Sequence, residues 1–345
     1  MNGKSVIIVA EMAWAHDGAL DKAIRIMQAA KDAGADAIGI HVTDLPSYMV
    51  PHYGSGEGRV SAGKEHVKVF QYLKDINLSN DDWLRFSDAA RAAGIALCVM
   101  PNDYASLSFC ENAIKPEFYV LTAAAFVESD FIVAVAQTGR PTIFRVGGAT
   151  IGEIEAALNL FRANGGGEPT LLHGFQNYPT RLEDTNIRQM RTLQEMFGVS
   201  VGLADHIDGG DPIAKAVPVL ALAFGATCIE KHITWSRVEK GEDFEAALDP
   251  QDFKEFVSYI RAGEIALGKH TWGSLSPAAE RYREVSRKRM VAARTIKAGA
   301  VLRREDLTFK RADVGLSPTM LESVMGRTTK SDLVENDGIT LEDLL

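Results

Sequence analysis

Three short apolar runs of this sequence each end in a histidine: LLH at 171–173, GLADH at 202–206 and IEKH at 229–232. In an α/β barrel the catalytic groups lie at the carboxyl ends of the strands, so successive strand ends would bring His173, His206 and His232 to one mouth. Imidazole is the commonest protein metal ligand and the usual carrier of protons near neutral pH. The alternative is that each histidine caps its own strand and bonds a neighbouring loop. Their joint occurrence favours a shared chemical site.

The elements that would position these histidines follow a regular alternation up to about residue 267. Amphipathic stretches at 20–33, 79–93, 183–197 and 212–224 are each followed by a glycine, which supplies the left-handed conformation that ends a helix. Eight strand–helix alternations predict a parallel sheet closed as a (β/α)8 TIM barrel. An open doubly wound sheet would show a glycine-rich turn after its first strand, where this chain has EMAWAHDG. The expected strands are 6–10, 37–42, 95–99, 118–121, 142–146, 170–173, 200–203 and 227–232.

The sequence predicts two domains joined by a linker. Residues 1–272 are expected to form the barrel, 273–288 a polar, charged linker, and 289–345 a small domain of short strand-like pieces and turns. The segment 43–77 is long for a barrel connection and rich in glycine, proline and tyrosine. It is interpreted either as a lid over the catalytic face or as a solvated insertion.

Composition narrows the class of protein. The chain has 345 residues, 46% hydrophobic and 24% charged, as in ordinary globular proteins. Its net charge of −9 argues against a nucleic-acid partner. Three cysteines without CxxC spacing suit a reducing cytoplasm. The first apolar run is soon interrupted by Glu11, so we expect no signal peptide, and no window approaches the length of a membrane span. A cytoplasmic location without a membrane partner is therefore predicted.

Together, the ordered motifs resemble those of the sialic acid (nonulosonic acid) synthases over nearly the whole chain. The motifs are EMAWAHDG at 11–18, LLHGFQNYPT at 171–180, DH at 205–206, IEKH at 229–232, GED at 241–243, the segment 289–294 and KR at 310–311. That family has a barrel followed by a C-terminal antifreeze-like, or SAF, domain. The resemblance implies the condensation of phosphoenolpyruvate with an N-acyl amino sugar, assisted by a divalent metal such as manganese or magnesium.

The resemblance also implies roles for individual residues. His206 and His232 match the two metal ligands, and they suit Lewis acid work because two imidazoles leave positions open for oxygen ligands. Glu11, Tyr178 and Asp243 match catalytic positions. Arg311 matches an arginine of the small domain that reaches over the barrel mouth of the other subunit, which implies a domain-swapped homodimer.

Departures from the family pattern fall on the groups that hold phosphoenolpyruvate. The second-strand lysine and glutamine are replaced by Gly39 and His41, and the fifth-strand serine by Arg145. The third-strand threonine is Met100, the sixth-strand asparagine is Gln176, and the serine before Asp205 is Ala204. The fourth-strand lysine, serine and glutamate are replaced by Val120, Ala123 and Ala125. Phosphoenolpyruvate carries close to three negative charges, and burying them without lysines would cost several kcal/mol per ion.

A changed reaction is therefore favoured: metal-dependent carbon–carbon bond chemistry on a sugar, polyol or keto acid, without phosphoenolpyruvate. In this hypothesis Arg145 grips an acidic group of the substrate, because a forked guanidinium suits a carboxylate. His41 or His173 moves a proton, and Gln176 and Asn177 contact the substrate. One alternative is an ordinary synthase whose phosphoenolpyruvate site is rebuilt by Arg145, His41 and Lys64 or Lys68. Another is a non-catalytic barrel scaffold.

Overall fold

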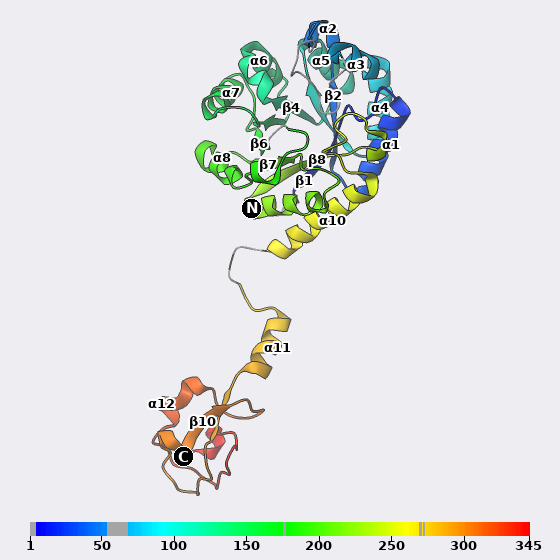
Figure 1. The fold of residues 1–345 in the computed structure, drawn as a ribbon. Helices are drawn as coiled ribbons and strands as arrows, with labels where there is room; N and C mark the ends of the chain where they lie inside the picture. The colour runs from blue at the N-terminus through cyan, green and yellow to red at the C-terminus, as the bar shows by residue number, and fades with distance from the viewer. Residues whose placement is uncertain (1–4, 54–67, 175–176, 269–270, 272) are drawn as a thin grey trace. The chain divides into compact units, whose positions relative to one another are not determined.

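The structure is a computed structural model that describes residues 5–53, 68–174, 177–268, 271 and 273–345. Eight parallel strands pair in sequence order and close into a barrel, which confirms the predicted TIM-barrel fold (Figure 1). The strands are β1 (Ile7–Ala13), β2 (Ala37–Val42), β3 (Ala96–Pro101), β4 (Phe118–Thr122), β5 (Thr142–Arg145), β6 (Thr170–His173), β7 (Val201–Asp205) and β8 (Ala226–His232).

Helices surround the barrel, and several end where the sequence predicts. Helix α1 (Leu20–Ala33) ends at Gly34 with φ of 93°, and α4 (Asn80–Ala93) ends at Gly94 with φ of 68°. The Ser79 side chain caps α4 by accepting a hydrogen bond from the backbone of Asp82. The other helices of this unit are α2 (Leu45–Tyr48), α3 (Val69–Ile76), α5 (Tyr104–Phe109), α6 (Ser129–Gln137), α7 (Ile151–Ala163), α8 (Gln189–Phe197), α9 (Leu220–Ala223) and α10 (Pro250–Leu267).

Two expected helices are shorter than predicted. The stretch 183–197 contains a short 3-10 segment and then α8 from Gln189, because Asn186 adopts φ of 40° and interrupts the helical path. The stretch 212–224 consists of two 3-10 segments followed by α9. Pro218 lies inside this stretch, and proline lacks the N–H that a continuous helix needs.

Alternation along the strands divides the core into two layers. Outward-facing side chains such as Phe144, Leu171 and Ile229 pack in the large apolar cluster between strands and helices. Inward-facing side chains fill the lower part of the barrel with a second apolar cluster: Val9, Ala37, Cys98, Met100, Val120, Ile143, Leu172, Ala204 and Cys228. The polar residues described below stand further along the same inward faces.

The chain divides into two compact units, Met1–Gly268 and Lys269–Leu345. The second unit contains α11 (Pro277–Ser286), β9 (Arg289–Ala292) paired antiparallel with β10 (Leu307–Lys310), and α12 (Leu321–Val324). Its own apolar cluster includes Met290, Leu302, Leu307, Val324 and Ile339. Helix α11 falls within the predicted linker, and the predicted domain bounds at 272 and 288 stay predictions. In the part of the chain that the structure describes, no helix has the length and apolar character needed to cross a bilayer.

Candidate active site at the barrel mouth

Polar side chains replace apolar ones where the inward faces of the strands approach their carboxyl ends. Two residues beyond the apolar cluster stand Glu11 on β1, Arg145 on β5 and Glu230 on β8, and all three are buried. The histidines follow at the end of the same faces, His232 two residues after Glu230 and His206 two residues after Ala204. The period of two along a strand therefore brings these groups into one space.

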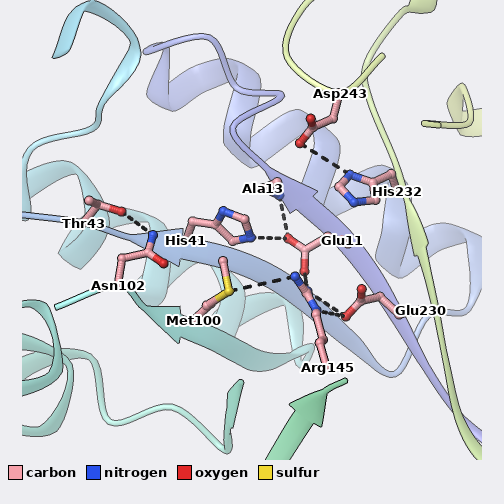
Figure 2. Close-up of polar contacts among 10 residues, drawn as sticks. All are labelled: Glu11, Ala13, His41, Thr43, Met100, Asn102, Arg145, Glu230, His232 and Asp243. Atoms are coloured by element: carbon pink, nitrogen blue, oxygen red, sulfur yellow. Dashed lines mark hydrogen bonds and ion pairs between the residues drawn. The ribbon is translucent and has the colours of Figure 1, made fainter. Parts of the chain in front are cut away.

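Arg145 lies between two carboxylates inside the barrel (Figure 2). Its Nε and Nη2 atoms donate to Glu230 Oε2 at 3.0 and 2.7 Å, and Nη2 also donates to Glu11 Oε2. Nη1 points to Met100 Sδ at 3.9 Å. Burial alone would lower the pKa of Arg145, but Glu230 and Glu11 raise it above its usual value. The guanidinium is therefore a fixed cation whose main partners belong to the protein.

Two carboxylates share one cation in this cluster, so negative charge is in excess. Burial raises the pKa of Glu230 and Glu11 raises it further, while Arg145 opposes both effects. Among the described residues, Glu230 Oε1 has no hydrogen-bond partner, although its side chain is only 1% exposed. A buried acceptor without a partner is costly, so this oxygen is available to a donor that enters the mouth.

Gly39 on β2 leaves the space that Glu11 occupies. The two residues are neighbours in register, and a Cβ atom at position 39 would lie 2.5 Å from Glu11 Oε2 and 2.9 Å from its Cδ. Atoms do not approach that closely, so any side chain at 39 would displace the carboxylate. Gly39, at the family's lysine position, thus makes room for the Glu11 carboxylate. That carboxylate in turn pairs with Arg145, which stands at the family's serine position.

His41 lies on the other side of Glu11. Its Nε2 atom is 3.6 Å from Glu11 Oε1, which accepts a hydrogen bond from the backbone of Ala13 at 2.7 Å. Burial lowers the pKa of His41 to about 4, against the opposing effect of Glu11. The imidazole is therefore neutral at pH 7 and can accept a proton.

The predicted metal ligands lie together. The ring centroids of His206 and His232 are 5.2 Å apart, and both side chains are buried. Two imidazoles that bind one cation through nitrogens at about 2.1 Å would place their centroids about 5 Å apart. Burial, followed by the proximity of His206, lowers the pKa of His232 well below its usual value, so His232 is a neutral base. Its Nε2 atom has no hydrogen-bond partner within the described ranges. These features fit a divalent cation.

Tyr178 and Asp243 complete the surroundings of this pair. The Tyr178 ring lies 4.8 Å from His206 and 5.4 Å from His232, nearly perpendicular to each. Burial raises the pKa of Tyr178 well above its usual value, so its hydroxyl keeps its proton. Asp243 Oδ2 is 3.9 Å from His232 Nδ1 (Figure 2). Within the described part of the chain, no group of three or more His, Cys, Asp or Glu side chains forms a metal cluster, so a cation here would need ligands from solvent or substrate.

His173 does not join the other two histidines. On β6, Leu172 faces the barrel interior, so the next residue points outward. His173 Nε2 is bonded to the carbonyl of Thr185 at 2.9 Å. Burial lowers the pKa of His173, although this backbone bond opposes the shift. The expectation that three strand-end histidines converge is therefore corrected to two, and the capping interpretation describes His173.

The predicted role of Arg145 also changes. A guanidinium that grips a substrate needs donors directed toward the mouth, whereas three of the contacts of Arg145 go to Glu230 and Glu11. Its side chain is 3% exposed. We therefore assign Arg145 to the positioning of these two carboxylates rather than to direct contact with substrate.

The remaining predicted positions are less constrained by the structure. Gln176 lies outside the described residues, as does Lys64, and the part of the predicted lid at 54–67 is also outside them. Asn177 is exposed, and its carbonyl accepts a hydrogen bond from the hydroxyl of Thr180. Arg311 belongs to the second unit, where it is exposed and donates to the carbonyl of Ser286 at 3.4 Å. Their predicted contacts with substrate stay predictions.

The spacing of two residues predicts that Glu230 shares the face of His232. Sequence reasoning did not predict that Glu230 accepts hydrogen bonds from Arg145. It also missed α3, whose Ile76 packs on Ala13 and Trp14 beside the end of β1. The C-terminal part of the long segment 43–77 therefore packs against the end of β1 at the mouth.

Comparisons with known proteins identify the family of both units. Residues 26–271 match the NeuB family, and residues 290–345 match the SAF domain. Pseudaminic acid synthase of Campylobacter jejuni is 28% identical over 341 residues, which cover 99% of this chain and 97% of that protein. An uncharacterised protein of Methanocaldococcus jannaschii is 32% identical over 345 residues, covering 99% of this chain and 96% of its own length.

A solved structure shares the fold. The N-acetylneuraminic acid synthetase of Leptospira borgpetersenii, solved with citrate, superposes with a TM-score of 0.69 and 25% identity, covering 82% of this chain and 92% of that one. The match to the family spans most of the chain and includes the segments that carry His206, His232 and Arg145. This chain therefore belongs to the NeuB family of sugar acid synthases and carries a C-terminal SAF domain.

Proposed function

We propose that this protein catalyses metal-dependent carbon–carbon bond chemistry on a sugar-derived substrate, with a co-substrate other than phosphoenolpyruvate. Carbohydrate condensation is supported by the family, whose members include pseudaminic and legionaminic acid synthases. His206 and His232 would hold the cation, manganese or magnesium, which would polarise a carbonyl or orient a pair of hydroxyls.

The pairing of Arg145 with Glu11 and Glu230 carries the proposal. Among the described residues of the eight strands, the cations are Arg145 and Lys231, and Lys231 is bound to Asp205. A trianion would therefore find no unpaired cation on the strands to replace its hydration shell.

Formal charge leads to the same conclusion. With every carboxylate ionised, Glu11, Glu230 and Asp243 contribute three negative charges, and Arg145 with a divalent cation would contribute three positive charges. Protonation of Glu230, whose pKa is raised, would leave one net positive charge. A mouth with a net charge between zero and plus one suits a neutral or singly charged ligand. An additional trianion would be left with uncompensated charge in a buried site, at a cost of several kcal/mol.

The side chains of the mouth have distinct proposed roles. Neutral His41 accepts a proton, and Glu11 beside it stabilises the imidazolium that results. The Tyr178 hydroxyl donates a hydrogen bond to developing negative charge. Asp243, whose Oδ2 lies 3.9 Å from His232 Nδ1, would orient that ring once the two atoms close to hydrogen-bond distance, as carboxylates near metal-ligating histidines commonly do.

Predicted partners follow from the family resemblance. Gln176 and Asn177 would contact the substrate, and Arg311 would reach the mouth of a second copy in a domain-swapped homodimer. A cytoplasmic location is proposed on the basis of cysteine content.

Calorimetric titration tests the proposal. Wild-type protein should bind Mn²⁺ in a manner lost in His206→Ala and His232→Ala, and Mn²⁺-loaded protein should give no heat with phosphoenolpyruvate. Tight phosphoenolpyruvate binding, with phosphate released when an N-acyl amino sugar is added, would establish the ordinary synthase instead. Wild-type protein that binds no Mn²⁺ would favour the non-catalytic scaffold.

A further inference from the structure

A second buried ion pair lies directly behind the two histidines. Lys231 Nζ is 2.6 Å from Asp205 Oδ2, and both side chains are 0% exposed. Asp205 precedes His206 on β7, Lys231 precedes His232 on β8, and the two are neighbours in register. Because side chains alternate along a strand, this pair faces outward where the histidines face inward.

The ion pair also holds the backbone that follows His206. Lys231 Nζ donates to the carbonyl of Ile207 at 2.8 Å. Ile207 forms a parallel bridge with Thr180, whose amide donates to the carbonyl of His206 at 2.8 Å. The pair is thus bonded to the backbone one residue beyond His206, and that residue bridges to Thr180, which bonds the His206 carbonyl.

The pairing of β7 with β8 is irregular, so a side-chain contact between the two strands can fix their register. The pairing of these strands shifts between Val201 and Gly202, near the start of β7. A slip of one residue would turn an inward side chain outward, and a smaller shift would change the distance between His206 and His232. Beyond the shift, the contact between Asp205 and Lys231 joins the two strands through side chains.

Stability alone does not account for this pair. Two charges removed completely from water lose hydration that their attraction only partly restores, and apolar side chains of similar size commonly stabilise a core as well or better. Fixing one register among alternatives is the best-attested use of such a buried polar contact.

We propose that Asp205 and Lys231 are positioning residues that set the register of β7 against β8 and so hold His206 and His232 at the spacing required by a shared divalent cation. This inference rests on the proposed metal site. It assigns no contact with substrate to either residue.

The test replaces both charges at once. The double variant Asp205→Leu/Lys231→Met should unfold near the wild-type temperature, because no charge is left unpaired. Its Kd for Mn²⁺ should rise about ten-fold or more, the scale seen when groups that orient metal ligands are removed. Its Co²⁺ absorption spectrum should change in intensity, because the angle between the two imidazoles is altered. Lys215→Met is the matched control, since Lys215 pairs with Asp252 and Glu255 on the outside of the barrel and should leave Mn²⁺ affinity unchanged.

Each possible result either supports or overturns the positioning role of Asp205 and Lys231. A folded double variant with wild-type Mn²⁺ affinity and an unchanged Co²⁺ spectrum would overturn it and leave the metal site intact. Wild-type protein that binds no Mn²⁺ would overturn the proposed function, and this inference with it. If the double variant does not fold, Asp205→Asn, which keeps the shape of the side chain, replaces it: a Kd raised several-fold supports positioning, and an unchanged Kd refutes it.

Discussion

Removing the charge of Arg145 distinguishes an internal role from a substrate-binding role. Arg145→Met keeps the apolar stem and deletes the guanidinium between Glu11 and Glu230. If the guanidinium only gripped substrate, the variant would lose activity and keep its stability. If it neutralises two buried carboxylates, the variant must lose stability without any substrate present.

The expected magnitude follows from burial. Glu11 and Glu230 are each 1% exposed, so solvent cannot replace the lost partner. Breaking a buried pair on one side costs about 3–5 kcal/mol. In the variant, the loss of Arg145, which lowers the pKa of Glu230, leaves the effect of burial unopposed and raises that pKa further, so the folded state binds more protons than the unfolded state around neutral pH. Stability should therefore rise as pH falls, by about 1.4 kcal/mol for each unit of raised pKa.

Urea unfolding at pH 7.5 and pH 5.5 measures this effect. We expect Arg145→Met to lose about 3 kcal/mol or more at pH 7.5, and about half of that at pH 5.5. The control is Arg162→Met, because Arg162 and Glu168 form a surface pair, 33% and 66% exposed. It should cost less than about 1 kcal/mol at either pH. An Arg145→Met variant as stable as the control at both pH values would refute the internal role.

Three further predictions follow from the same geometry. Burial lowers the pKa of His16 to about 3 and of His41 to about 4, so the unfolded state binds more protons below about pH 6.5; stability should fall by several kcal/mol between pH 6.5 and 4. The urea midpoint of His41→Asn should therefore change less with pH than the midpoint of the wild type. Equal changes in the two proteins would contradict this prediction. Gly39→Ala should lose about 1–3 kcal/mol in thermal unfolding, because its Cβ meets a carboxylate, whereas Gly152→Ala on α7 has open space and should lose nothing. His173→Ala should lower Tm but keep full Mn²⁺ binding by calorimetry; loss of Mn²⁺ binding would return His173 to the site.

Much of the fold could be predicted from the sequence because its signals are local. Strand–helix alternation and glycines such as Gly34 and Gly94 lie within a few residues of what they specify. The closeness of His206 and His232 followed from the same logic, since both end neighbouring strands on the same face. These predictions needed only the period of the strand and the sequential order of a barrel.

The pairing of Arg145 was decided only by the tertiary structure. Its partners are 134 and 85 residues away, and nothing near Arg145 in sequence indicates that Glu11 and Glu230 meet it in the barrel interior. The outward direction of His173 likewise depends on whether Leu172 or its neighbour enters the interior, a difference of one residue in register. Residue types and their order therefore predicted that His206 and His232 meet at the mouth, whereas the direction of His173 and the electrostatic state of the mouth depend on register and on which charges become neighbours when eight strands close.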